Sequence, residues 1–144
     1  FDATPYAIGT ARFLLRNPLN QSLPRKFKFN FSCCEKHGMT RITDVGLIPQ
    51  IRELDGKNQR GFKIFLGGGL GNKSFVGHQL EDFTSEEDLL YTSIAVLQIL
   101  IGWVTERTWQ ETECVILLMK WAGINSKTWF LSRERLLGQH NQLL

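Results

Sequence analysis

The chain has 144 residues, of which 42% are hydrophobic and 22% are charged, as in an ordinary globular domain. Seventeen basic and fourteen acidic residues give a net charge of +3, which is too small to indicate a nucleic-acid partner. Three cysteines, two of them adjacent, do not form a disulfide framework and favour a reducing compartment, which we expect to be the cytoplasm.

The first part of the chain predicts one helix followed by a small sheet. Thr4-Pro5 has the pattern of an N-cap followed by a proline in the first helical position, and Asn17-Pro18 ends the helix near Arg16. Runs that contain apolar residues follow, separated by turn and loop signals such as Gly38, Pro49 and Asp55-Gly56. They predict three strands, over residues 26–32, 42–49 and 62–66.

A polar segment connects the second and third predicted strands. Residues 52–61 have the composition of a loop, and Asp55-Gly56 within it is a turn signal typical of hairpins. Because so short a connection joins neighbouring strands that run in opposite directions, we expect antiparallel pairing. The glycine-rich residues 67–72 that follow are predicted to form a flexible turn.

From residue 84 onward the pattern changes to helices. Thr84-Ser85-Glu86-Glu87 has the spacing of a capping box, with acidic residues where the helix dipole favours them. The uncharged residues 89–105 approach the length of a membrane span, but polar side chains interrupt them, which favours a core helix and no membrane partner. Further helices are predicted over residues 108–122 and 126–137.

Together these elements predict an α+β fold. We expect a small, mainly antiparallel sheet of at least three strands, covered by helices and followed by a helical C-terminal third. The length suits a single domain over residues 1–144. Its sheet-containing part is predicted to cover residues 1–83 and its helical part residues 84–144.

Cations and aromatic rings alternate along residues 26–31. Since side chains alternate across a strand, Lys26 and Lys28 share one face, and their ammonium groups would lie about 7 Å apart. Two cations on a rigid strand suit a small anion or a carboxylate. Alternatively, this is a half-buried edge strand whose lysines are solvated and discourage pairing with another chain. The opposite face, which can anchor the strand in a core, consists of Phe27, Phe29 and Phe31.

Several motifs follow one another at modest spacings. They are Leu23-Pro24-Arg25-Lys26-Phe27-Lys28, Thr43-Asp44-Val45-Gly46-Leu47-Ile48 and Gly61-Phe62-Lys63-Ile64-Phe65-Leu66-Gly67-Gly68-Gly69-Leu70-Gly71. In this order they resemble the sirohaem- and iron–sulfur-containing nitrite/sulfite reductase family. The opening Phe1-Asp2-Ala3-Thr4-Pro5-Tyr6-Ala7, which leads into the first predicted helix, fits the same pattern. The resemblance covers roughly residues 1–100.

The resemblance implies roles for individual residues. In the family, the two lysines of this strand bind the oxyanion substrate beside the sirohaem, and they correspond here to Lys26 and Lys28. The preceding Arg25 would pair with carboxylates of the sirohaem, since a guanidinium binds a carboxylate through two parallel hydrogen bonds. The glycine-rich turn would let the backbone pass close to the cofactor, because glycine has no Cβ. Its glycines are Gly67, Gly68, Gly69 and Gly71.

The reaction that the resemblance implies is the six-electron reduction of sulfite or nitrite at sirohaem. The cofactors carry the redox chemistry, and the lysines stabilise the bound anion electrostatically and then donate protons. An electron-donor protein or subunit is the expected partner, together with the small-anion substrate. The implied cofactors of the full-length enzyme are sirohaem and a 4Fe-4S cluster.

The cysteines depart from the family pattern. The family holds its cluster with four cysteines in two pairs, whereas this chain has Cys33, Cys34 and Cys114. Adjacent thiolates on an extended backbone point in different directions and make poor cluster ligands. We therefore expect the chain to be one piece of a longer reductase, bound to the remainder of that enzyme. Isolated, it should be inactive and bind neither cofactor fully.

Other interpretations of these patterns remain open. A divergent piece of such an enzyme could be a non-catalytic scaffold or interaction module that keeps the fold without the cofactor, or a general anion-binding domain. Cys33-Cys34-x-x-His37 resembles a zinc motif only superficially, because a second pair of ligands is missing, so we expect no metal site there. The glycine-rich turn lacks the lysine and hydroxyl residue that end a nucleotide-binding loop.

Overall fold

The computed structural model describes residues 1–23, 26–71 and 74–104. Its main sheet has four strands in the order β1-β2-β3-β6, and β4 and β5 form a separate two-stranded ribbon. β1 runs parallel to β2, and the other neighbours are antiparallel, which confirms the predicted α+β fold with a mainly antiparallel sheet. The strands are β1 (Phe29–Phe31), β2 (Val45–Leu54), β3 (Lys57–Leu66), β4 (Gly69–Leu70), β5 (Ser74–Phe75) and β6 (His78–Ser85).

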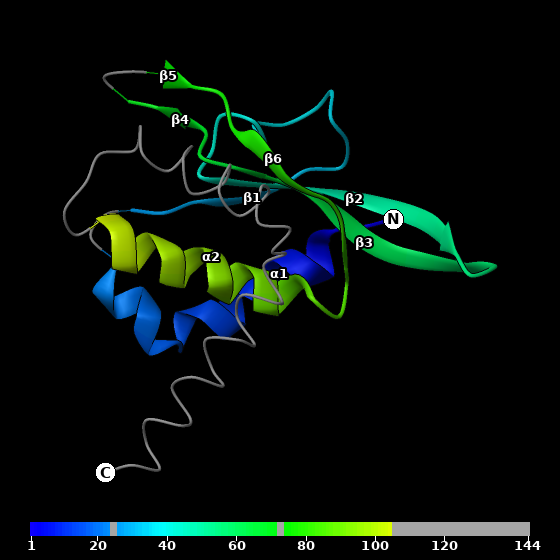
Figure 1. Ribbon diagram of the computed structural model, residues 1–144, viewed down its shortest axis with the longest axis horizontal. Helices are drawn as coiled ribbons and strands as arrows, with labels where there is room; N and C mark the ends of the chain where they lie inside the picture. Colours follow the sequence, from blue (N-terminus) through cyan, green and yellow to red (C-terminus); the bar gives the residue numbers. More distant parts are fainter. Residues whose placement is uncertain (24–25, 72–73, 105–144) are drawn as a thin grey trace, which may run out of the picture.

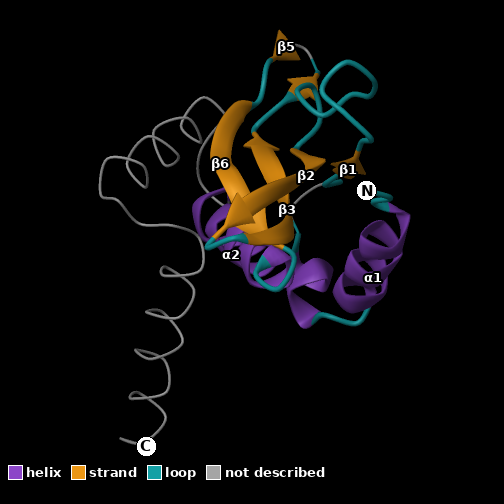
Figure 2. Cartoon of the chain, turned by 90° about the vertical axis from the view of Figure 1, so that its right-hand side faces the viewer, coloured by secondary structure: helices purple, strands orange, loops and turns teal. Residues whose placement is uncertain are grey.

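The helices lie together on one side of the main sheet (Figures 1 and 2). They are α1 (Thr4–Leu15), the short 3₁₀ helix η1 (Pro18–Ser22) and α2 (Leu89–Val104). Within the described residues, no helix is both long enough and apolar enough to span a membrane. The predicted helices over 108–122 and 126–137, and with them the helical C-terminal third, lie outside the described residues.

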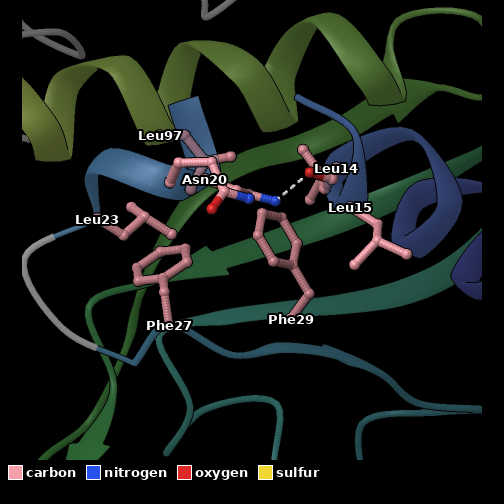
Figure 3. Close-up of a pocket in the computed structure, with 8 residues that line it drawn as sticks. Leu14, Leu15, Asn20, Leu23, Phe27, Phe29 and Leu97 are labelled. Atoms are coloured by element: carbon pink, nitrogen blue, oxygen red, sulfur yellow. Dashed lines mark hydrogen bonds between the residues drawn. The ribbon is translucent and has the colours of Figure 1, made fainter. Parts of the chain in front are cut away.

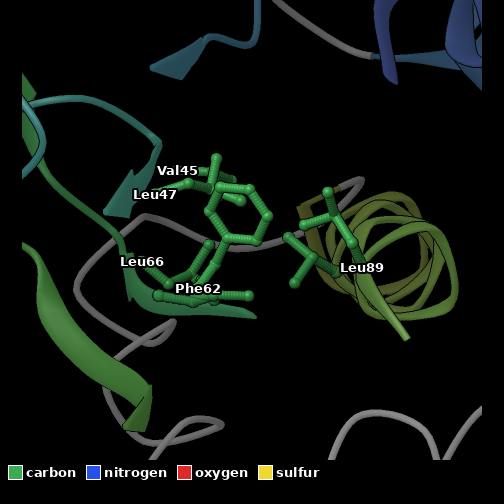
Figure 4. Packing of buried hydrophobic residues seen from close by; sticks show 7 residues of the cluster. Val45, Leu47, Phe62, Leu66 and Leu89 are labelled. Carbon is green, nitrogen blue, oxygen red and sulfur yellow. The ribbon is translucent and has the colours of Figure 1, made fainter. Parts of the chain in front are cut away.

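The core lies between this sheet and α2 (Figure 4). Phe62 on β3 is fully buried, and its ring makes edge-on contacts with the rings of Phe1, Tyr6 and Phe31 at centroid distances of 5.5, 5.2 and 5.8 Å. The N-terminus and β1 are therefore both attached to the centre of the sheet. The buried cluster consists of Val45, Leu47, Phe62, Ile64, Leu66, Leu89 and Val96.

The hairpin between β2 and β3 is longer than predicted. Leu54 pairs with Lys57, so only Asp55 and Gly56 form the turn, and both have positive φ angles, of 53° and 73°. Such a turn matches the twist of the flanking strands. The prediction of antiparallel pairing is confirmed, but the prediction that residues 52–61 form a loop is wrong. These residues are strand that extends beyond the helices, so their polar composition reflects exposure.

The other predicted boundaries shift as well. The capping box at residue 84 is wrong, because Thr84 and Ser85 belong to β6, and α2 begins at Leu89. The Ser85 hydroxyl instead accepts a hydrogen bond from the Asp88 N–H in the turn before the helix (3.2 Å). At α1, the N-cap is Ala3, one residue earlier than predicted. The first two strands start later than predicted, at residues 29 and 45.

Candidate functional site

The backbone of Lys28 is hydrogen-bonded at both of its polar atoms. Its N–H donates to Oδ2 of Asp44 (2.9 Å), and its carbonyl accepts from the N–H of Val45 (3.0 Å). Asp44 is only 8% exposed, so its carboxylate is itself held within the protein. The direction in which the Lys28 side chain leaves the strand is therefore fixed by β2 and the residue that precedes it.

The predicted alternation of cations and rings is confirmed. Lys26 and Lys28 are exposed, whereas Phe27, Phe29 and Phe31 are partly buried and pack against the core cluster. The alternation holds although the regular strand begins only at Phe29. Among the described residues, neither lysine has an ion-pair partner. Both ammonium groups are thus available to an anion from solution.

Two of the phenylalanines border a pocket of about 330 Å³ on the helix side of the sheet (Figure 3). The amide nitrogen of Asn20 donates to the carbonyl of Leu14 at its centre, and the remaining wall is mostly apolar. The lysines leave the strand on the opposite side, so this pocket is no part of the cationic face. Its lining residues are Leu14, Leu15, Asn20, Gln21, Leu23, Phe27, Phe29 and Leu97.

The outer face of the sheet, away from the helices, carries further cations. Asn30, Gly46 and Phe65 are neighbours across β1, β2 and β3, and alternation places them on the same side as Lys28. The guanidinium of Arg41 and the ammonium of Lys63 each lie 5.4 Å from the centroid of the Phe65 ring, within the range of a cation–π contact.

The loop over residues 32–44 lies on this outer face, where Figure 1 shows it as a cyan trace. The Arg41 carbonyl accepts a hydrogen bond from the N–H of Gly77 (2.6 Å), and the Asp44 carbonyl accepts one from the N–H of Gly67 (2.9 Å). A Cβ on Gly68 would lie 2.5 Å from the Arg41 carbonyl oxygen. The loop therefore packs directly on the glycine-rich segment.

The predicted cofactor-binding glycines have different surroundings. Gly67 has a positive φ of 85°, and Gly68 is buried against the loop, so backbone conformation favours glycine at 67 and packing requires it at 68. Gly69 belongs to β4, with open space where a Cβ would be, and Gly71 is exposed. The roles of these four residues toward a cofactor stay predictions. Arg25, the fifth predicted cofactor ligand, lies outside the described residues.

A tight turn in the same loop brings together the side chains of the Cys33-Cys34-x-x-His37 motif, at which no metal site was expected. Cys34 and His37 pair across an isolated antiparallel bridge, with Cys34 Sγ 3.0 Å from Nδ1 of His37 and 3.9 Å from Sγ of Cys33. Adjacent thiols were expected to point apart, as on an extended backbone. That expectation is wrong because the chain bends at Cys33. The hydrogen bond with His37, and then those from the amides of Lys36 and His37, lower the pKa of the Cys34 thiol from 9.0 to about 7.

Comparison with known proteins decides the family. The model of the nitrite and sulphite reductase 4Fe-4S domain matches residues 1–114. The chain belongs to this family. The nitrite and sulphite reductase resemblance stated from the motifs is thereby confirmed.

Individual members of the family are similar to parts of the chain. An assimilatory ferredoxin-dependent nitrite reductase from Haloferax mediterranei is 38% identical over 72 residues, which are 49% of this chain and 12% of that protein. The structure of the Mycobacterium tuberculosis NirA protein matches 74% of this chain and 22% of its own, with a TM-score of 0.55 and 18% identity, a likeness of fold. The chain thus spans a small fraction of the length of these relatives.

The residues of this nitrite and sulphite reductase domain do not fit a complete 4Fe-4S cluster. Such a cluster takes four cysteine thiolates, and the whole chain contains three cysteines. In the described part, Cys33 and Cys34 lie in one turn, with a histidine as their neighbour. No step of the reaction can therefore be assigned to a cluster held by this chain alone.

Proposed function

We propose that this chain is the part of a longer, sirohaem-dependent nitrite or sulfite reductase that binds the anionic substrate through Lys26 and Lys28. One observation supports this proposal above the others. Both lysines are exposed on one side of a segment whose rings are anchored in the core and whose backbone is fixed by Asp44. A site of this kind needs cations held in place before the anion arrives.

The two ammonium groups would act in succession. Each offers N–H donors to the oxygens of nitrite or sulfite, and their positive charge stabilises the negative charge on the bound anion. Each oxygen of the substrate that is lost as water takes up two protons, and a lysine within hydrogen-bonding distance can donate one at a time and regain it from solvent. When bound, sirohaem would supply the iron and pass on the electrons that come from the electron donor.

The chain offers a plausible chemical fit to the anionic edge of sirohaem. The exposed Lys26 and Lys28, with Arg41 nearby on the outer face, provide positive charge toward a cofactor rich in carboxylates. We assign Arg25 and the glycine-rich turn the supporting role in binding it. The four cluster thiolates would come from other parts of the longer enzyme, and a small electron-donor protein, such as the ferredoxin used by the Haloferax relative, would reduce it.

A non-catalytic scaffold is the second candidate, and the cysteine count favours it. A domain that cannot hold the cluster could retain the fold for contact with the remainder of the reductase. The visible spectrum of the longer protein separates the two candidates. Sirohaem absorbs strongly in the visible range, so a colourless protein with full iron and cofactor supply during expression would support the scaffold.

Steady-state reduction of nitrite and of sulfite by the full-length reductase tests the role of the lysines. Lys26→Met and Lys28→Met should each lower turnover about a hundredfold or more, as loss of a preorganised donor does. Lys57→Met is the matched control, because this exposed lysine lies at the hairpin turn of β3. Sirohaem content is measured in each variant. Unchanged turnover in both variants would show that Lys26 and Lys28 are solvated edge-strand residues without a role in the reaction.

A further inference from the structure

A second candidate site, made of other residues than the two lysines, lies on the outer face at the turn of Cys33, Cys34 and His37. One ligand atom from each residue, two sulfurs and one imidazole nitrogen, lies within 4.8 Å of the other two. A tetrahedral zinc ion with Zn–S bonds of about 2.3 Å and Zn–N bonds of about 2.0 Å separates its sulfurs by about 3.8 Å and sulfur from nitrogen by about 3.5 Å. The two sulfurs are 3.9 Å apart, close to the first of these values. Cys34 Sγ and Nδ1 of His37 are hydrogen-bonded at 3.0 Å, so binding an ion would move them about 0.5 Å further apart.

The turn is held in this shape by its surroundings. The hydroxyl of the buried Ser32 hydrogen-bonds with the carbonyls of Cys34 and His37, so it closes the turn from below. Gly38 follows with a φ of 109°, and a Cβ on it would lie 2.4 Å from Ser32 Oγ. The turn that carries the three ligand residues is thus shaped by the contacts of Ser32 with its carbonyls and by the positive φ of Gly38.

The surroundings of the sulfur also suit a metal thiolate. The sulfur of Cys34 lies 3.0 Å from Nδ1 of His37 and 3.9 Å from the sulfur of Cys33, so all three ligand atoms face one another. Glu35, between the ligands, forms an ion pair with Lys63 of β3 (2.6 Å), so the turn is tied to the sheet. Cys33 and His37 are exposed, which leaves a path for an ion from solution.

We propose that Cys33, Cys34 and His37 form a binding site for a thiophilic transition-metal ion, foremost Zn²⁺, with the fourth position open. Two thiolates and an imidazole select such ions over Mg²⁺ or Ca²⁺, which prefer oxygen ligands. The sequence analysis expected no metal here because a second ligand pair is missing. Three protein ligands with an open position are nevertheless a known zinc arrangement. The site does not depend on the proposed reductase chemistry.

Cobalt is the probe for this site, because Zn²⁺ has no spectrum. The reduced, metal-free 144-residue chain is titrated anaerobically with Co²⁺. We expect one equivalent to bind with a thiolate-to-cobalt charge-transfer band, and Zn²⁺ to displace it. Cys34→Ser and His37→Gln should each weaken binding at least tenfold. His78→Gln and Cys114→Ser, which change the same residue types elsewhere in the chain, should leave it unchanged.

A second measurement uses the unmodified chain, so it does not depend on whether the variants fold. Alkylation of Cys33 and Cys34 by iodoacetamide is followed by mass spectrometry with and without Zn²⁺. We expect Zn²⁺ to slow modification of both cysteines at least tenfold and Mg²⁺ to have no effect. The proposal is overturned if alkylation is not slowed, if no charge-transfer band forms, or if Cys34→Ser and His37→Gln bind Co²⁺ like the original chain.

Discussion

The carbonyl oxygen of Thr40 lies against the Cα of Gly46 so closely that a Cβ on Gly46 would stand 1.9 Å from it. Gly46 is the second residue of β2, and Thr40 is a buried residue of the loop over 32–44. The contact is between two backbones, so no side-chain movement can relieve it. Close approach of this loop to the sheet therefore requires glycine at position 46.

Gly46→Ala should lower the free energy of unfolding by about 1–3 kcal/mol, the range for forcing a methyl group into a packed site. Urea unfolding followed by circular dichroism measures this change. Gly69→Ala is the control, because nothing lies within 4 Å of the place its Cβ would take. A Gly46→Ala protein as stable as the original would show that the loop does not pack on β2 as described.

Gly9→Ala should have the opposite effect. Gly9 lies inside α1, is exposed, and has no atom within 4 Å of the position of a Cβ. Because alanine loses less backbone entropy than glycine in a helix, the free energy of unfolding should rise by about 0.5–1 kcal/mol. The same urea experiment detects it. A loss of stability would indicate that this surface of α1 is covered in the folded chain.

Asp44→Ala should show how far the backbone at Lys28 depends on the carboxylate of Asp44. The variant leaves the Lys28 N–H without the acceptor that it has now, which should cost about 1–3 kcal/mol of unfolding free energy. Asp44→Asn keeps an oxygen acceptor and should recover part of this loss. Hydrogen exchange measured by NMR provides a local readout, since the amide of Lys28 should exchange faster in Asp44→Ala. Equal exchange rates in the two proteins would contradict the assignment of this hydrogen bond.

The alkylation rate of Cys34 should depend on pH in the physiological range. In metal-free protein, its hydrogen bond with His37 lowers the pKa of the thiol to about 7. Only the thiolate reacts, so the rate should rise as pH increases through about 7, well below the ordinary thiol range. In His37→Gln the midpoint should move to higher pH. Cys33 modification in the same samples provides an internal comparison, and an unmoved Cys34 midpoint would exclude His37 as the cause.

Sequence reasoning predicted the elements whose signals are local. The two-residue turn at Asp55-Gly56 follows from the residues themselves, and the alternation at 26–31 correctly separated the lysines from the phenylalanines. β6 was missed because its pairing with β3 contains register shifts and its burial does not alternate regularly. The residues at the end of β6, Thr84-Ser85-Glu86-Glu87, have the sequence pattern of a capping box, although no helix begins there. Long-range pairing, which no local pattern records, made this segment a strand.

Of the two candidate sites, one could be predicted from a local sequence pattern and the other could not. The lysines could be found because a strand's period of two residues places them. The turn of Cys33, Cys34 and His37 could not, because its shape depends on a bend, on the buried Ser32 and on the positive φ of Gly38. The only sequence signal for this turn was the run Cys-Cys-x-x-His followed by glycine, at residues 33–38. Without the geometry, the missing second pair of ligands counted against a metal.

The hydrogen bond from Lys28 to Asp44 replaces one rung of the parallel ladder. Phe29 is aligned with Val45, which is the first residue of β2. The residues just before Val45 are not strand, so the N–H of Lys28 has no strand carbonyl to donate to. A side-chain oxygen accepts it instead and prolongs the pairing by one step. The pairing therefore extends from Phe29 to Lys28 because of Asp44, which lies 16 positions after Lys28 in the chain. A substitution of Asp44, far from Lys28 in sequence, would remove the acceptor that holds the backbone of Lys28 just before β1.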